Sequence, residues 1–337
     1  MMWEKGLAYP FLRPPSAAVI DEVPEALRDE NWQRVNHAAI PSLYPPLSSL
    51  VFALAARIGD LFGGRYLLSL KLMLVLLELA ALSILARAGV EASVLAACPL
   101  LIFEVAREGH HDSVALLGLA LFVLGARRLS PRLAHAGLAL ASLGKLFALA
   151  LHPLTLAWSR RGAIVPGALL LLLLPLPLFF GGLEASLGLR TYASAWRAGD
   201  GAFSLILWIA ESLPLAEPEA AARAAVAVLY LAFLAWCLLS RASLEQRTAR
   251  ALTLLLLLSP TLHPWYALWI LPLVEVSEGG AAVALLALVP LFHAAGWLEL
   301  TEGAWRVPAG LRAAVHLPVW ALWLSGMVRA CRSSQGR

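Results

Sequence analysis

The stretch EVAREGHHD at residues 104–112 is followed directly by SVALLGLALFVLGA at residues 113–126. The first segment packs six ionisable side chains into nine residues, in a chain that is 60% hydrophobic. A charged side chain at the centre of a membrane-spanning helix costs about 2.5–3.5 kcal/mol, even on the scale that gives the lowest values. Residues 104–112 are therefore expected at a membrane surface or in a hydrated cavity, with an apolar helix starting immediately after them.

The composition is that of a membrane protein that crosses the bilayer many times. Only 14% of the 337 residues are charged, whereas a soluble domain has about 25%. The formal net charge of +4 lies mostly in short arginine-bearing loops and forms no basic stripe, which argues against nucleic-acid binding. The three cysteines are isolated, which argues against a disulfide framework or a thiolate metal site. The predicted fold class is an all-α polytopic integral membrane protein.

Two regions divide the chain. Residues 1–45 are polar and proline-rich and carry Trp3 and Trp32, a composition typical of a segment lying at a membrane interface, here on the outer face. Residues 46–337 form the predicted transmembrane helical bundle. Its outer loops are expected near residues 104–112, 181–219, 259–266 and 299–310.

A first short hairpin follows from the arginines, because short cytoplasmic loops carry an excess of Lys and Arg. Residues 133–158 form one long apolar run with arginine clusters at both ends, so a single crossing would place one cluster on the wrong side. Two short helices that turn at Gly144-Lys145 remove this conflict. They place Lys145 on the outer side of the membrane.

A second short hairpin is expected between Arg250 and Glu278, because proline stands on both sides of His263 and breaks the helix there. Broken helices are tolerated at membrane depth where they line a cavity. The two tips and residues 109–112 are expected to converge on the same outer side. The bundle then has about 10–11 crossings and a cytoplasmic C-terminus.

Each polar group also has a purely structural interpretation. Asp112 fits the N-cap position of the helix that follows it. Lys145 is expected to pair with a carboxylate elsewhere in the bundle. Lys71 and Glu78 lie on one helical face and are expected to pair with each other. His263 is expected to stabilise the proline-broken turn through a hydrogen bond.

No metal site and no cofactor is predicted. His110, His111 and Asp112 place three potential ligands in a row, but adjacent residues on a helix diverge by about 100°. A facial metal site would therefore need other ligands, for which the sequence has no motif.

Gathered on one side, the same groups suit chemistry on a phosphate. Lys145, Arg107 and Arg190 carry positive charge for a phosphate group. Carboxylates or His263 suit removal of a proton from a hydroxyl group. A lipid-borne phosphate presented at the outer leaflet explains why such chemistry belongs in a membrane bundle.

Several short motifs, in this order along the chain, resemble those of GT-C-type glycosyltransferases, which use polyprenyl-phosphate sugars. They are Y-P-P-L at residues 44–47, P-L…E…G-H-x-D at 99–112, L-G-K at 143–145, the loop at 189–196, and S-P-x-x-H-P-W-Y at 259–266. The chain resembles in particular the bacterial mannosyltransferases of family 87 over residues 3–265. The resemblance implies a GT-C-like helical bundle in the inner (cytoplasmic) membrane. It also implies transfer of a hexose, mannose-like and usually with inversion, to an acceptor on the periplasmic or exterior side.

The resemblance also implies roles for particular residues. Lys145 and Arg190 would contact the carrier phosphate. His110, Asp112 and His263 would line the pocket for the sugar or the acceptor. The remaining residues expected around the substrate are Tyr44, Glu104, Trp196 and Tyr266.

In that family an aspartate in the first outer loop, just after the first transmembrane helix, acts as general base on the acceptor hydroxyl. This chain opens inside what resembles that loop, without a first helix or a matching aspartate. The expectation is either a longer natural protein or an inactive relative. The remaining candidates for a base are Glu4, Asp21 and His263.

Two other classes of function stay open. Transporters and flippases of lipid-linked or small polar substrates also use broken helices and buried charges, but their inverted repeats are not visible in the hydropathy of the two halves. An inactive GT-C-like scaffold is the third possibility. The expected partners are a lipid-linked sugar donor, a glycolipid, glycan or protein acceptor and the membrane, without nucleic acid.

Overall fold

The computed structural model describes residues 9–17, 37–91, 95–296, 298 and 307–335. Within these ranges the chain forms helices and turns without a strand, and one isolated β-bridge pairs Ala198 with Thr261. The prediction of an all-α membrane protein is confirmed. Five helical stretches in the described ranges are long and apolar enough to cross a membrane, namely Tyr66–Arg87, Arg161–Ala195, Pro218–Leu239, Glu278–Gly296 and Ala309–Arg332.

Other crossings that the sequence predicts fall on shorter helices. Helix α8 (Asp112–Arg127) has 16 residues and α9 (Pro131–Gly144) has 14. At 1.5 Å per residue, sixteen residues extend about 24 Å, which is less than the hydrocarbon thickness of about 30 Å. The count of about 10–11 crossings therefore stays a prediction.

Both predicted helix breaks are present. After α9 the backbone of Lys145 is extended, with φ −147° and ψ 125°, and the return leg η5 (Leu146–Leu151) packs back against α9. The second break follows α16 (Leu244–Leu258), where an extended segment leads into η8 (Pro264–Val276), which packs against α16. Each break thus ends in a hairpin whose tip carries a polar side chain.

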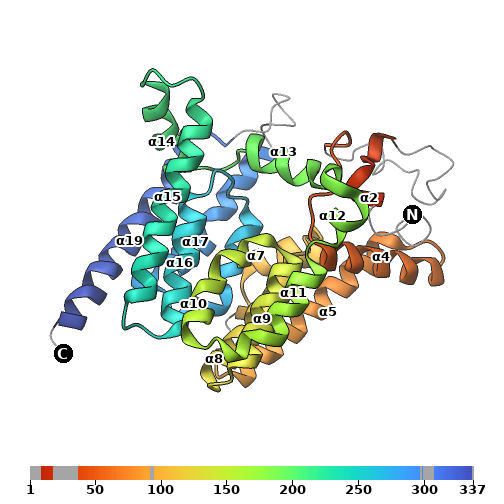
Figure 1. Ribbon diagram of the computed structural model, residues 1–337, viewed down its shortest axis with the longest axis horizontal. Coiled ribbons are helices and arrows are strands. Elements are labelled where there is room, and N and C mark those ends of the chain that lie inside the picture. Colours follow the sequence, from red (N-terminus) through yellow and green to blue (C-terminus); the bar gives the residue numbers. More distant parts are fainter. Residues whose placement is uncertain (1–8, 18–36, 92–94, 297, 299–306, 336–337) are drawn as a thin grey trace.

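The helices form two groups that lie side by side (Figure 1). In this view α13 (Leu187–Ala195) lies across one end of the bundle, close to α2 (Tyr9–Leu12) and α12 (Leu176–Gly181). Residues 181–219 are predicted as an outer loop, and the structure shows that they are partly helical. Residues 299–306, which belong to the last predicted outer loop, lie outside the described residues. One group contains α4 (Pro46–Leu61), α5 (Tyr66–Arg87), α8, α9 and α11 (Ile164–Leu173), and the other contains α15 (Pro218–Leu239), α16, α17 (Ala281–Leu288) and α19 (Ala309–Gln335).

Helix α8 forms the centre of its group, with 13 of its 16 residues buried. Glycines bring its backbone into direct contact with α9. A Cβ atom on Gly118 would lie 2.4 Å from the backbone nitrogen of Ala141, and one on Gly137 would lie 2.4 Å from the backbone nitrogen of Phe122. Small residues at such crossings let helices approach closely. This contact fixes α9, which leads into the first hairpin tip, against α8, which begins at Asp112.

Gly137→Ala is expected to destabilise the protein by about 1–3 kcal/mol, because the added methyl group meets backbone atoms that cannot move aside alone. Gly167→Ala is the matched control, since a Cβ atom on Gly167 of α11 meets nothing within 4 Å. It should be neutral or slightly stabilising. Thermal unfolding of the two variants in detergent measures the difference, and equal melting temperatures would contradict the close α8–α9 contact.

Two ion pairs close the end of α8 that lies away from Asp112. Arg127 lies 2.9 Å from carboxylate oxygens of both Glu245 and Glu275. One guanidinium group thereby joins α8 to α16 and η8.

The predicted pair between Lys71 and Glu78 within α5 is not formed. The ammonium group of Lys71 donates instead to the backbone oxygen of Arg107. Seven helical residues span about 10.5 Å, too far for Lys71 to prefer Glu78 over a nearby carbonyl.

Candidate functional site

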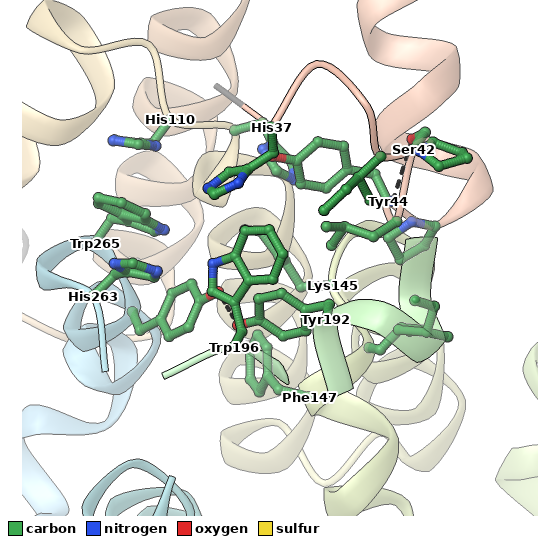
Figure 2. Close-up of a pocket in the computed structure, with 18 of the residues that line it drawn as sticks. His37, Ser42, Tyr44, His110, Lys145, Phe147, Tyr192, Trp196, His263 and Trp265 are labelled. Atoms are coloured by element: carbon green, nitrogen blue, oxygen red, sulfur yellow. Dashed lines mark hydrogen bonds between the residues drawn. The ribbon is translucent and has the colours of Figure 1, made fainter. Parts of the chain in front are cut away.

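A cavity of about 1050 Å³ lies where the two hairpin tips meet α13 and parts of the N-terminal segment (Figure 2). Its volume is at the upper end of the range of about 300–1,000 Å³ usual for ligand pockets. The walls come from residues within 10–15, 37–52, 110–111, 145–150, 189–196 and 255–269. Segments that are far apart in the sequence therefore meet here, as the sequence predicts for the two tips and residues 109–112.

Three aromatic rings form a stack along one wall of the cavity (Figure 2). Trp265 lies between His110 and His263, with ring centroids 3.7 Å and 4.3 Å apart and interplanar angles of 17° and 7°. Pro260 and Pro264 interrupt the helix, so His263 is extended and Trp265 lies in the first turn of η8. Because each face of Trp265 is covered by a histidine, a ligand meets the ring edges, which carry N–H donors and nitrogen acceptors.

Helix α13 is tied to the second hairpin across the cavity. The hydroxyl groups of Tyr192 and Tyr266 are hydrogen-bonded at 2.6 Å. Tyr266 stacks on Trp269 at 4.4 Å, and Trp269 stacks on Phe147 of the first hairpin at 3.7 Å. Aromatic contacts therefore join α13 and both hairpins around one space.

Lys145 occupies the tip of the first hairpin and is nearly enclosed. Its Nζ lies 3.3 Å from Oδ2 of Asp112, whose side chain is fully buried. Trp269 Nε1 donates to the other carboxylate oxygen at 2.6 Å. The ammonium group also lies 5.7 Å and 5.4 Å from the ring centroids of Tyr44 and Tyr266. The predicted pairing of Lys145 with a carboxylate is confirmed, whereas Asp112 makes no side-chain cap for α8.

The charged side chains that line the cavity are cations. Lys145 and Arg13 are the cations that line it, and no carboxylate lines it among the residues the structure describes. Burial lowers the pKa of His110 to about 4 and that of His263 to about 3, so both imidazoles are neutral near pH 7. Burial also raises the pKa of Tyr44 to about 12. The wall therefore suits an anionic ligand that also carries hydroxyl groups.

The predicted site residues fall into four sets. Glu104 and Asp112 lie behind the wall, in contact with His110 and Lys145 respectively. Arg190 is exposed on α13 and is not part of the cavity wall, so its contact with a phosphate stays a prediction. Glu4 and Asp21 lie outside the described residues. The residues that line the cavity are Tyr44, His110, Lys145, Trp196, His263 and Tyr266.

Some lining residues were not predicted as site residues. His111 is buried in the wall, and its Nε2 has no hydrogen-bond partner within the described part of the chain. Buried polar atoms are normally paired, but this nitrogen has almost no accessible surface through which a ligand in the cavity could reach it. The ring of His37 lies 4.2 Å from that of Trp196 at the edge of the cavity. Neither histidine has a sequence motif that separates it from an ordinary surface or core histidine.

No group of three His, Cys, Asp or Glu side chains in the described ranges is arranged to hold a metal ion. No protein-family model, curated protein or solved structure matches the chain.

Proposed function

We propose that the protein is a membrane glycosyltransferase that moves a hexose, mannose-like, from a polyprenyl-phosphate carrier to an acceptor hydroxyl on the outer side of the cytoplasmic membrane. The observation that carries the proposal is the enclosed cation Lys145 beside a wall of neutral ring edges, in a cavity of about 1050 Å³ within an apolar helical bundle. The cation can bind the negative charge of a phosphate, and the ring edges can form hydrogen bonds with the hydroxyl groups of a sugar. A lipid-borne donor lies in the membrane, next to such a helical bundle.

The carrier phosphate is assigned to Lys145. An ammonium group in a largely dry site interacts strongly with phosphate oxygens. Apolar side chains of Leu146, Phe147 and Leu149 line the cavity next to it, where the polyprenyl chain of the carrier would continue. The sugar hydroxyls then face the ring edges of His110 and His263.

The reaction is a displacement at the anomeric carbon. The acceptor oxygen forms the new C–O bond, while the bond from that carbon to the phosphate oxygen breaks and its electron pair leaves with the phosphate. Lys145 stabilises the charge that develops on the leaving group. The acceptor proton goes to a neutral imidazole of the cavity wall.

The test uses the full chain, purified and reconstituted in lipid nanodiscs or vesicles with a radiolabelled polyprenyl-phosphate hexose and membrane-extracted acceptors. Label should appear on an acceptor, and free polyprenyl phosphate should be released in equal amount. A nucleotide-activated sugar should not serve as donor. Movement of intact donor between leaflets without any new glycosidic bond would favour a flippase and overturn the proposal.

A further inference from the structure

A second polar cluster lies directly behind the cavity wall. The carboxylate of Glu104 is fully buried, and its two oxygens face two different histidines. Oε1 lies 2.7 Å from Nε2 of His293, and Oε2 lies 3.5 Å from Nε2 of His110. Such a carboxylate is expensive to bury and needs partners. Glu104 lies between two imidazole rings, and each of these groups can bind or release a proton.

The three side chains connect two separate surfaces. The side chain of His110 is 30% exposed and lines the cavity, whereas that of His293 is 38% exposed and does not line it. Glu104 itself has no exposed side-chain area. The carboxyl group of Glu104 therefore lies between the cavity-lining His110 and a second, partly exposed histidine.

Local structure holds the carboxylate in place. Glu104 belongs to a π-helix, η4 (Ile102–Arg107), and single π-turns are frequent at functional sites. The backbone N–H of His110 donates to the backbone oxygen of Glu104 at 2.9 Å, which fixes the loop relative to the helix. His293 comes from η10 (Val289–His293), and its ring packs 4.8 Å from that of Phe103.

We propose that His110, Glu104 and His293 form a proton relay that carries the acceptor proton out of the cavity. The proposal rests on the proposed glycosyl transfer. The acceptor O–H bond breaks and its proton binds Nδ1 of His110, which releases the proton on Nε2 to Oε2 of Glu104. In the resting cluster Glu104 is a carboxyl group that donates the proton on Oε1 to Nε2 of His293. As Oε2 gains the proton from His110, the Oε1 proton passes to Nε2 of His293, and His293 releases its Nδ1 proton to water. Each group returns to its starting charge.

The relay explains where the proton goes after His110 has taken it from the acceptor hydroxyl. With its pKa lowered to about 4 by burial, His110 does not retain a proton near neutral pH. Glu104 is a better resting place, because burial raises its pKa, while the hydrogen bond and charge of His293 lower it. The other charged groups that face the cluster are Asp112 and Glu108, which raise the Glu104 pKa, and Lys145, which lowers that of His110.

A purely structural tie between η4 and η10 is the competing interpretation, and proton chemistry separates the two. Glu104 and His293 act through His110 and are positioning residues, so loss of activity alone does not decide. His293→Gln keeps a side chain that donates a hydrogen bond to Glu104 but cannot carry a proton. His293→Ala opens a half-exposed space that added imidazole can enter.

The experiment measures kcat for sugar transfer against pH in reconstituted wild-type protein and in variants. His293→Ala and His293→Gln should both lose about tenfold or more, and imidazole should restore the alanine variant. The alkaline limb of the profile, where the Glu104 carboxyl group loses its proton, should move to higher pH in His293→Ala, because Glu104 loses the partner that lowers its pKa. Glu104→Gln should abolish that limb and resist imidazole. Glu108→Gln is the matched control, since Glu108 pairs with Arg107 at 2.9 Å on the same segment. Its kcat should stay at the wild-type level and imidazole should not change it, while the same limb moves slightly to lower pH because one group that raises the Glu104 pKa is gone.

The outcomes are distinct. A wild-type kcat in His293→Ala, or recovery by His293→Gln without rescue by imidazole, overturns the relay while sugar transfer by the wild type upholds the proposed function. If the wild type transfers no sugar from any polyprenyl-phosphate hexose, the proposed function is overturned and the relay with it.

Discussion

Lys145→Met is expected to lower kcat/KM for sugar transfer from a polyprenyl-phosphate donor by at least about 100-fold, the usual effect of removing one group that stabilises developing charge. Lys145 is the enclosed cation of the cavity, with its side chain only 12% exposed. Water cannot easily take its place around a phosphate. The other lining cation, Arg13, is exposed and lies on a different segment.

The single variant does not isolate this effect, because Lys145 also neutralises Asp112. Removing one partner of a buried ion pair costs about 3–5 kcal/mol of stability, since the remaining charge stays buried. Asp112 would keep only the hydrogen bond from Trp269 that the structure records for it. If the melting temperature of the variant falls, the loss of activity could come from unfolding and not from the loss of the phosphate contact.

The double variant Lys145→Met with Asp112→Asn removes both charges and keeps the amide oxygen as an acceptor for Trp269. Its melting temperature should lie close to that of the wild type, while transfer stays lost. Lys145→Arg keeps the positive charge and should retain part of the activity. Transfer at the wild-type rate by the well-folded double variant would remove Lys145 from the site.

The sequence predicts the two hairpin tips because each rests on a strong physical restriction. An ammonium group in the middle of an apolar run cannot reach either membrane surface, and prolines on both sides of His263 interrupt the helix. The structure has a break at each place. The position of α13 is different. Short amphipathic helices take their place from what they pack against, and no periodic pattern in residues 181–219 specifies Pro41 as the contact of Gly188, where a Cβ atom would lie 2.2 Å from the Pro41 oxygen.

Asp112 shows where a local rule fails. Its place before an apolar run suits an N-cap, but the carboxylate turns inward to Lys145 and Trp269. A buried ammonium group needs a counter-charge, and that need outweighs a cap worth about 1 kcal/mol. The contact between Glu104 and His293 joins residues 189 positions apart. Nothing near His293 in the sequence indicates that it faces a carboxylate, so only the tertiary structure brings this cluster together.

Trp265→Ala is expected to reduce kcat/KM about 10- to 100-fold at neutral pH, because the cavity wall loses two ring-stacking contacts worth about 0.5–1.5 kcal/mol each. Its ring separates His110 from His263 and holds both in parallel planes. Without it, the two imidazoles lose the contact that orients their edges toward the cavity. Trp265→Phe is the matched control, since a smaller aromatic ring still fits between them. It should lose much less activity.

The pH dependence separates this explanation from a general loss of structure. In the wild type, burial lowers the pKa of His110 to about 4 and of His263 to about 3, so neither is charged between about pH 5 and 7. The space left by the indole admits water, and both pKa values should rise toward about 6.5. The histidines then gain protons as the pH falls, and a protonated imidazole can no longer accept a proton from the acceptor hydroxyl. The activity of Trp265→Ala relative to the wild type should therefore fall steadily as the pH drops through this window. A ratio that stays constant with pH, together with normal melting, would mean that Trp265 does not control the charge of its neighbours.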